Sequence, residues 1–274
     1  KAKDLIGIKI IIMNEIKKVS IIIPCRNEEN YIRNCLDSIL NQDYPKSHIE
    51  ILVINGDSDD ETLNVLSKYN KELVVINNPR RIVPISMNLG IKNAKGSFIV
   101  RIDAHCIYPK NYISELINNS IKYSSDNIGC IMETLPANKS AKARAIAIAI
   151  SHPMGVGNSY FRIGAKEVKE VDTVPFGCYR KEVFDRIGLY DEELVRNQED
   201  DLNGRLMQSG GKIILLPNLI LKYYARDTIK KTYKMFFQYG LYKPLVNSKL
   251  RKPVTIRQFV PLLFVLSILL GFTF

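Results

Sequence analysis

The chain has 274 residues, of which 46% are hydrophobic and 24% are charged, and its formal net charge is +11. This composition is ordinary for a soluble protein and can fill the core of one large domain or two small ones. Five scattered cysteines without a CxxC pair exclude a disulfide framework and favour a reducing, cytosolic compartment.

Residues 1–18 are expected to form an N-terminal extension. The apolar stretch at 6–23 is interrupted by Lys and Glu, and no small-residue cleavage site follows it. The sequence therefore predicts no cleavable signal peptide in this part of the chain.

From Val19 onward, apolar runs alternate with segments of helical periodicity. The apolar runs predict buried strands at 19–24, 49–55, 72–78 and 97–103. The periodic segments predict helices at 27–40, 59–69 and 84–94. This alternation predicts an α/β fold with a mainly parallel sheet covered by helices.

Beyond residue 110 the alternation fades. We expect helices at 111–123, 140–150 and 197–210, strands at 128–135 and 212–217, a glycine-rich loop at 152–165, and a strand, turn and helix over 171–188. No linker interrupts this part, so 19–221 is expected to form one domain. Gly155 and Gly157 do not make a dinucleotide site, because the third glycine of that fingerprint is missing.

A basic, aromatic segment over 222–258 follows this domain. Between Lys222 and Arg257 there are ten Lys or Arg residues and one acid, interleaved with Tyr and Phe. The next segment, 259–274, has no charge and is shorter than the roughly 20 residues of a membrane-spanning helix. It is expected to be either a short or truncated span or a buried core helix.

A basic aromatic segment beside an apolar one is typical of the cytoplasmic face of a cell membrane. Aromatic residues among basic ones can also stack on nucleic-acid bases, but the uncharged segment that follows makes this interpretation less favourable. We therefore predict association with the membrane and no nucleic-acid partner.

Polar side chains follow each predicted strand of the first half. Because the carboxyl ends of parallel strands meet at one edge of the sheet, where ligands bind, we expect these side chains to converge. They are Glu28, Asn55, Asp57, Asp59, Asp60, Arg80, Arg81, Asp103 and His105. The acids could bind ribose, a base or a divalent cation, and the two arginines could neutralise phosphate.

Asp103 and His105 end the strand at 97–103, and the single residue between them lets both side chains reach one ion. A carboxylate oxygen with an imidazole nitrogen favours Mn²⁺ over Ca²⁺, because imidazole prefers transition metals. Taken alone, His105 is better explained as a hydrogen-bonded turn histidine. The polar ends of the neighbouring strands are what favour a metal site.

The chain resembles family 2 inverting glycosyltransferases with the GT-A fold, and within them the membrane-linked exopolysaccharide branch typified by succinoglycan glucosyltransferases. The likeness covers about residues 18–225 and is carried in order by "VSIIIPCRNEENYIRNCLDSILNQDYP", "EILVINGDSDDET", "NPRRIVPISMNLGIKNAKGSFIVRIDAH", "VPFGCYRKEVFDRIGLYDE" and "NQEDDLNGRL".

The resemblance implies a nucleotide-binding set at the strand ends. Pro24, Arg26 and Glu28 would line the base, and Asn55 stands where the family usually has an Asp. The other implied nucleotide-binding residues are Asp57, Asp60, Arg80, Arg81 and Asp103. The metal-binding D-x-D of the family is replaced here by Asp103-Ala104-His105, which would hold Mn²⁺ or Mg²⁺.

The resemblance also implies a catalytic base at the start of the helix at 197–210. The family pattern E-D-x-[DE]-L, anchored on Leu202, puts Glu199 at the base position and Asp201 at the second acid. Anchoring on the letters "ED" instead selects Asp200. Phe176 and Gly177 resemble the acceptor side of the site, to which Asp201 would also belong. Capping of a helix N-terminus is the alternative role of these acids.

Together these residues imply an enzyme, a metal-dependent inverting hexosyltransferase. It would move a sugar from a nucleotide sugar, expected to be a UDP-sugar, to a hydroxyl of a lipid-linked or polysaccharide acceptor. The alternative is an inactive protein of the same fold that binds a nucleotide or a membrane partner, and Asn55 and His105 are the departures that favour it.

Overall fold

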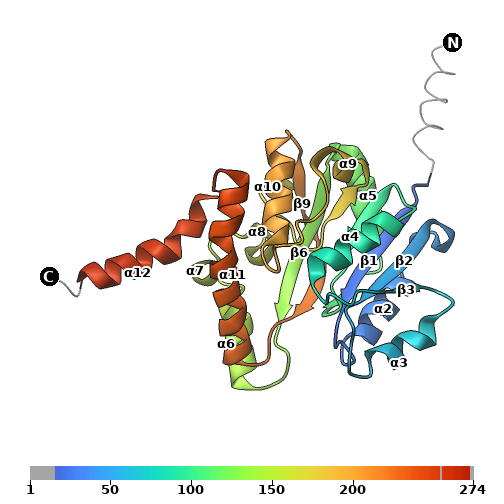
Figure 1. The fold of residues 1–274 in the computed structure, drawn as a ribbon, viewed down its shortest axis with the longest axis horizontal. Helices are drawn as coiled ribbons and strands as arrows, with labels where there is room; N and C mark the ends of the chain where they lie inside the picture. The colour runs from blue at the N-terminus through green and yellow to red at the C-terminus, as the bar shows by residue number, and fades with distance from the viewer. Residues whose placement is uncertain (1–15, 254, 272–274) are drawn as a thin grey trace, which may run out of the picture.

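The computed structural model describes residues 16–253 and 255–271 (Figure 1). Most of the predicted N-terminal extension and the last three residues of the predicted apolar segment lie outside the described residues. Within the described part, helices cover both faces of one sheet, which confirms the predicted α/β class.

In these described ranges the sheet has nine strands. They are β1 (Val19–Cys25), β2 (Ile49–Asn55), β3 (Val74–Asn77), β4 (Phe98–Arg101), β5 (Cys106–Ile107), β6 (Asn127–Leu135), β7 (Lys169–Glu170), β8 (Cys178–Arg180) and β9 (Ile213–Tyr224). Their order is β3-β2-β1-β4-β8-β6-β9-β5, and β7 also pairs with β9.

The sheet is mixed: the predicted parallel arrangement holds for its first half, and its second half combines one parallel pair of strands with antiparallel ones. Strands β1 to β4 pair in parallel, and so do β6 and β9. Strand β8 lies antiparallel between β4 and β6, while β5 and β7 lie antiparallel on β9.

The helices of the described residues are α2 (Ile32–Leu40), α3 (Thr62–Leu66), α4 (Val83–Asn93), α5 (Tyr112–Tyr123), α6 (Ala141–Ala149), α7 (Pro153–Val156), α8 (Tyr160–Ile163), α9 (Glu182–Ile187), α10 (Gln198–Gln208), α11 (Ile229–Leu250) and α12 (Val260–Gly271). Helices α2 and α5 pack on one face of the sheet, and α4, α9 and α10 pack on the other.

Strand β1 shows why the first strands are continuous apolar runs. Ile21 and Ile23 lie in the core on one face of the sheet, and Ile22 lies in the core on the other face. Successive side chains of a strand point to opposite faces, so a strand covered on both sides has no solvent-facing position for polar residues.

Two segments differ from the sequence prediction. The predicted glycine-rich loop at 152–165 contains the short helices α7 and α8. Strand β9 continues past Pro217 to Tyr224, because its register against β6 shifts after Cys130 and leaves the proline outside the ladder. The predicted domain boundary between residues 221 and 222 therefore lies inside a strand.

The basic aromatic segment forms α11, which packs against α10. Leu194, Val246 and Leu250 make a small buried cluster between them. Helix α12 extends away from the rest of the chain and buries none of its residues, which contradicts the buried-core alternative for this segment (Figure 1). Among the described helices, none has both the length and the hydropathy that crossing a membrane requires.

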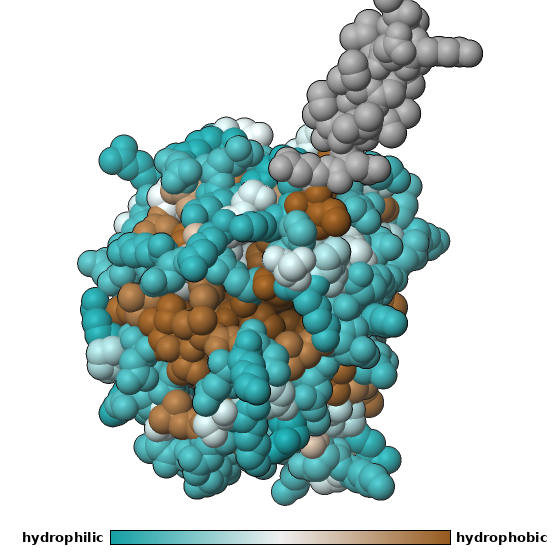
Figure 2. Space-filling model, turned by 90° about the vertical axis from the view of Figure 1, so that its right-hand side faces the viewer, coloured by the Kyte–Doolittle hydropathy of each residue, from teal (hydrophilic) through white to brown (hydrophobic). Residues whose placement is uncertain are grey.

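Strand β3 forms the edge of the sheet farthest in strand order from β9. Val74 and Val75 of this strand are exposed, and Figure 2 shows apolar surface on this side of the molecule. The cavity described below is lined from α8, α10 and α11, which lie away from this edge (Figure 1). The apolar edge is therefore not part of the candidate site.

Candidate active site

The turn after β4 meets the loop after β1 and brings two carboxylates to one imidazole. His105 Nδ1 lies 3.3 Å from Asp103 Oδ1, and His105 Nε2 lies 3.2 Å from Glu28 Oε2. The backbone N–H of His105 donates to Asp103 Oδ1 at 2.9 Å. These three predicted site residues therefore do converge at the carboxyl ends of neighbouring parallel strands.

Burial and the charges of neighbouring groups have opposing effects on the pKa values of Glu28, Asp103 and His105. Burial raises the pKa of Glu28 to about 7, against the lowering effect of His105. Burial also opposes ionisation of Asp103, but the hydrogen bond and charge of His105 bring its pKa down to about 2. Burial of His105 favours its neutral ring and so lowers its pKa. The hydrogen bond to Asp103 and the charges of Asp103 and Glu28 have a larger effect, and the pKa of His105 is raised. Asp103 is therefore an anion at neutral pH.

The donor atoms at Asp103 and His105 fit a divalent cation. Asp103 Oδ1 and His105 Nδ1 lie 3.3 Å apart and share a hydrogen bond, so a cation held by both would take the place of that proton. A carboxylate oxygen with an imidazole nitrogen suits Mn²⁺ better than a cation that takes oxygen ligands alone. No group of three His, Cys, Asp or Glu side chains among the described residues is placed to hold a metal. A cation here would take its other ligands from a substrate or from water.

Helix α10 begins with three consecutive acids that point in different directions. A helix turns by about 100° per residue, so neighbouring side chains diverge. Glu199 pairs with Arg101 of β4, and Asp200 pairs with Lys243 of α11. Acids are favoured at a helix N-terminus, but capping alone does not explain a separate cationic partner for each of these side chains.

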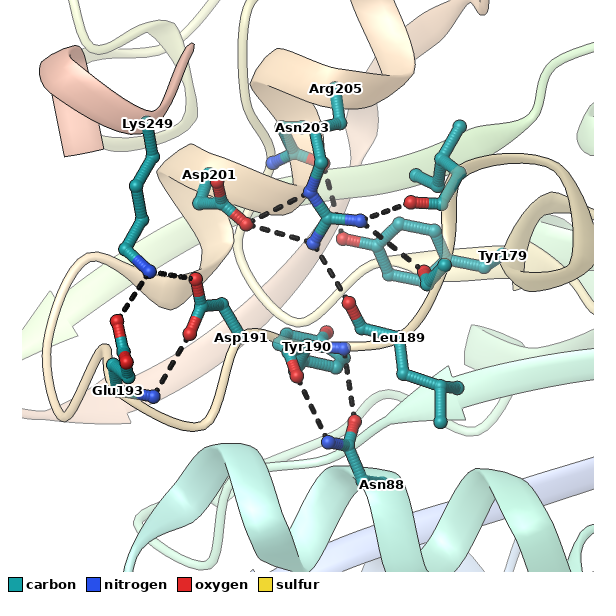
Figure 3. A network of polar contacts seen from close by, with 12 residues as sticks. Asn88, Tyr179, Leu189, Tyr190, Asp191, Glu193, Asp201, Asn203, Arg205 and Lys249 are labelled. Carbon is teal, nitrogen blue, oxygen red and sulfur yellow. Dashed lines mark hydrogen bonds and ion pairs between the residues drawn. The ribbon is translucent and has the colours of Figure 1, made fainter.

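Asp201, the third acid, is not brought to the cavity. Arg205 donates two hydrogen bonds to its carboxylate, at 2.8 and 3.0 Å, and a further one to the carbonyl of Leu189 (Figure 3). Lys249 of α11 binds Asp191 in the same region (Figure 3). Asp201 is nearly fully buried and braces the loop before α10, so its placement does not favour the predicted acceptor-side role.

Glu199 and Asp200 face a cavity with a volume of about 400 Å³, which Asp103 also lines. Its other polar and aromatic walls include Arg101, Arg162, Phe176, Tyr223, Arg226 and Lys243. Burial raises the pKa of Glu199, while the charge of Arg101 opposes the rise. A buried carboxylate of raised pKa in a cavity is a candidate general base. The predicted base and the predicted metal residue thus share one cavity.

The family model described as glycosyl transferase family 2 matches residues 20–188, more than half of the chain. The chain belongs to this family. The glycosyltransferase class that the sequence implied is thereby confirmed, and the protein is an enzyme of that class.

Two relatives of this glycosyltransferase match most of its length. A Methanococcus voltae protein named dolichyl N-acetyl-α-D-glucosaminyl phosphate 3-β-D-2,3-diacetamido-2,3-dideoxy-β-D-glucuronosyltransferase is 32% identical over 242 residues, which are 84% of this chain and 74% of the relative. Succinoglycan biosynthesis protein ExoA of Rhizobium meliloti is 27% identical over 247 residues, 88% of this chain and 74% of the relative.

Solved structures support the GT-A-like fold of this glycosyltransferase. S. aureus TarS 1–349 in complex with UDP-GlcNAc matches with a TM-score of 0.63 and 21% identity, over 82% of this chain and just under two thirds (65%) of the other. The mannosyltransferase PcManGT of Pyrobaculum calidifontis, in complex with GDP-Man and Mn²⁺, matches with a TM-score of 0.66 and 16% identity, over 92% of this chain and 69% of the other.

Several predicted nucleotide-binding residues of the glycosyltransferase are engaged with neighbours at the strand ends. The buried amide of Asn55 donates to Asn77 Oδ1 at 3.0 Å and accepts from the Ser58 hydroxyl at 2.7 Å. Its side chain therefore shapes the loop after β2. Asp57 and Arg81 form an ion pair there, and both are half exposed.

The remaining members of the set lie around this loop. Arg80 pairs with Glu192 at 2.9 Å and is largely exposed. Asp60 accepts the backbone N–H of Thr62 at 3.0 Å at the start of α3. Pro24 lies within β1, and Arg26 follows it as an exposed residue. These residues surround the same end of the sheet as Asp103, although they do not line the cavity of Glu199.

The two predicted acceptor-side residues before β8 have different positions. Phe176 lines the cavity, and the guanidinium of Arg101 lies 5.5 Å from its ring centre. Gly177 lies against β6, where an added Cβ would come within 2.0 Å of Asn127 Oδ1. Close approach of the backbone to Asn127 therefore requires a glycine at 177, so its role here is packing.

Arg101 and Lys243 are among the cations of the site that sequence reasoning missed. Arg101 is a single charged residue inside an otherwise apolar strand, which is a signal that could have singled it out. Lys243 lies in the segment that the sequence assigned to a membrane interface, and nothing local distinguishes it from the other lysines there. Only the packing of α11 on α10 brings it to Asp200.

Proposed function

We propose that the protein is a metal-dependent inverting glycosyltransferase that uses a nucleotide sugar, a UDP-sugar, and a hydroxyl of a lipid-linked or polysaccharide acceptor. The observation that carries the proposal is the shared cavity of Glu199 and Asp103. Glu199 has the chemistry to accept a proton, and Asp103 has the negative charge to hold the cation that accompanies the donor.

Glu199 is the proposed general base. Its carboxylate takes the proton of the acceptor hydroxyl as the oxygen attacks the anomeric carbon and the bond to the nucleoside diphosphate breaks. A single displacement inverts the anomeric configuration and needs no covalent enzyme intermediate. Arg101 holds the carboxylate in position from β4. Asp200 is the alternative base, and its carboxylate is held by Lys243.

Asp103 and His105 are the proposed ligands of Mn²⁺ or Mg²⁺. When bound, the cation would offset the negative charge that develops on the leaving diphosphate. Arg226 also lines the cavity, and its positive charge acts on Glu28 and His105. We propose that Arg226 supports the diphosphate on the same side, with the base and ribose bound among the loops after β1, β2 and β3.

The names of the relatives support the choice of substrates. The M. voltae relative is named for a dolichyl-phosphate-linked acceptor, and ExoA is named for succinoglycan biosynthesis. The TarS structure holds UDP-GlcNAc, whereas PcManGT holds GDP-Man and Mn²⁺. A panel of UDP-, GDP- and dTDP-sugars with Mn²⁺ or Mg²⁺, with and without lipid-linked acceptors, tests the proposal by nucleotide release. No release and no nucleotide binding by calorimetry would leave the inactive alternative.

Removing Arg101 is expected to move the pH profile. Glu199 acts as a base only when it is deprotonated, and Arg101 lowers its pKa. In Arg101→Met that effect is lost, the pKa of Glu199 rises, and the acid limb of kcat/KM shifts to higher pH. Arg101→Lys, which keeps a cation there, should shift it less. Equal acid limbs in wild type and Arg101→Met would contradict the role of Glu199.

The proposed place of action is the cytoplasmic face of the cell membrane, with α11 and α12 on the lipid side. Lys230, Lys234 and several aromatic residues of α11 are exposed, and so are the apolar side chains of α12. A basic residue near an anionic surface contributes about 1 kcal/mol of binding. The catalytic domain would then end with β9. Helix α11 would both line the cavity and contact the membrane.

Reversing two charges of α11 is expected to weaken vesicle binding. The double variant Lys230→Glu and Lys234→Glu should sediment less with vesicles containing phosphatidylserine, and the difference should shrink at high salt. Lys68→Glu with Lys71→Glu, two exposed positions after α3, is the matched control. Equal sedimentation of the two double variants would contradict a membrane role for this face of α11.

A further inference from the structure

Arg162 of α8 is a guanidinium inside the cavity that the proposed chemistry does not use. Its side chain donates to Thr134 Oγ1 at 3.3 Å, and its guanidinium carbon lies 5.5 Å from the ring centre of Phe161 and 5.7 Å from that of Tyr223. It is thus held by two aromatic rings and one hydroxyl. This arrangement fixes the position of a cation without neutralising it.

Within the described residues, Arg162 forms no ion pair, and neither do Arg196 and Arg226 of the same cavity, whereas Arg101 and Lys243 do. Arg101 is paired with Glu199, and Lys243 is paired with Asp200. Burial lowers the pKa of Arg162, and the groups that oppose this effect are tyrosines and a cysteine rather than carboxylates. Arg162 is partly buried, and a cation withdrawn from water without an anion is costly unless a ligand supplies the negative charge.

The cavity that Arg162 lines also has apolar lining residues. They are Ile150, Val156, Phe161, Met235 and Phe236. Met154 of α7 is 93% exposed and lies close in sequence to two of these lining residues. A ligand that fits here has one anionic group and an apolar part beside it.

Arg162 lies in the same cavity as Asp103, and Tyr223, whose ring it contacts, also experiences the charge of Asp103. The charge of Arg226 acts on Glu28 and His105, whereas the groups that act on Arg162 are Tyr223, Tyr239 and Cys106. The polar ends of β1, β2 and β3 do not contribute to the wall around Arg162. Arg162 and Arg226 are therefore two cations of one cavity that also contains Asp103, and they act on different neighbouring groups.

We propose that Arg162 binds the phosphate of a lipid-phosphate-linked acceptor, with the start of its alkyl chain against the apolar wall formed by α7, α8 and α11. The inference rests on the proposed function and narrows its acceptor to a phosphate-bearing lipid. Arg162 would hold the phosphate, and the sugar attached to that phosphate would lie toward Glu199.

Calorimetry on the whole chain, loaded with Mn²⁺ and saturating UDP, tests this inference. The probe is octyl phosphate, and octyl glucoside, with the same chain and no charge, is the control ligand. Loss of a charge-assisted hydrogen bond should weaken octyl phosphate binding about tenfold or more in Arg162→Met. UDP affinity should stay the same in that variant. Arg144→Met, at an exposed arginine of α6, should bind octyl phosphate as wild type does.

Each contrary result has its own meaning. Equal binding of octyl phosphate by wild type and Arg162→Met, or no binding by UDP-loaded wild type, would overturn the inference and leave the proposed function standing. A weaker affinity for UDP in Arg162→Met, with octyl phosphate unchanged, would assign Arg162 to the donor and also overturn it. A wild-type protein that binds octyl phosphate through Arg162 but no nucleotide would overturn the proposed function and keep the anion site. Melting curves of each variant establish that it is folded.

Discussion

Glu199→Gln is expected to lower kcat by about 10²- to 10⁴-fold while nucleotide binding survives, because the amide keeps the shape of the side chain but cannot accept the acceptor's proton. The carboxylate of Glu199 is partly buried, has a raised pKa and faces the cavity shared with Asp103. Single-turnover transfer and calorimetry with the nucleotide measure the two effects separately.

The same substitution should also reduce stability, because Arg101 loses its partner. Removing one member of a buried ion pair costs about 3 kcal/mol or more, so the assays belong well below the melting temperature of the variant. Glu182→Gln, another acid in the first turn of a helix, is the matched control and should leave kcat unchanged. Near-complete loss of kcat in Asp200→Asn, with activity retained in Glu199→Gln, would assign the base to Asp200.

Asp103→Asn is expected to lower kcat/KM by about a hundredfold and to raise the Mn²⁺ concentration needed for half-maximal activity. The amide is neutral and a poorer ligand, and loss of about 3 kcal/mol of charge stabilisation on the leaving group corresponds to that factor. The low pKa of Asp103 shows that the wild-type residue is charged throughout the physiological range. Initial rates over a Mn²⁺ titration give both quantities.

A chelator should abolish the wild-type activity, and added Mn²⁺ should restore it. Asp37→Asn, at an exposed acid of α2, is the control and should have the Mn²⁺ dependence of the wild type. Full activity of wild type in excess chelator would exclude the proposed metal site. The site would then have to offset the charge of the diphosphate with arginines alone, and Arg226 of the cavity is one candidate.

Sequence patterns predicted the first half of the fold well, because its signals are local. The run "VSIII" requires burial on both faces, and the polar residues after β1 and β4 must meet once these strands pair in parallel. The second half was predicted less well. The mixed pairing of β8 and the extension of β9 past Pro217 depend on which neighbour each strand finds, and no short window of sequence contains that information.

The sequence by itself determined the enzyme class and the positions along the chain of Asp103, His105 and Glu199, because a motif is a property of spacing. Tertiary structure decided which of those residues share a cavity. It turned Asp201 toward Arg205, since consecutive residues of a helix diverge, and it placed α11 over α10 so that Lys243 reaches Asp200. It also left Arg162 partly buried beside aromatic rings without a carboxylate. A contact between distant segments depends on packing. Packing therefore determines whether a charged side chain has an opposite charge beside it or needs a ligand to supply one.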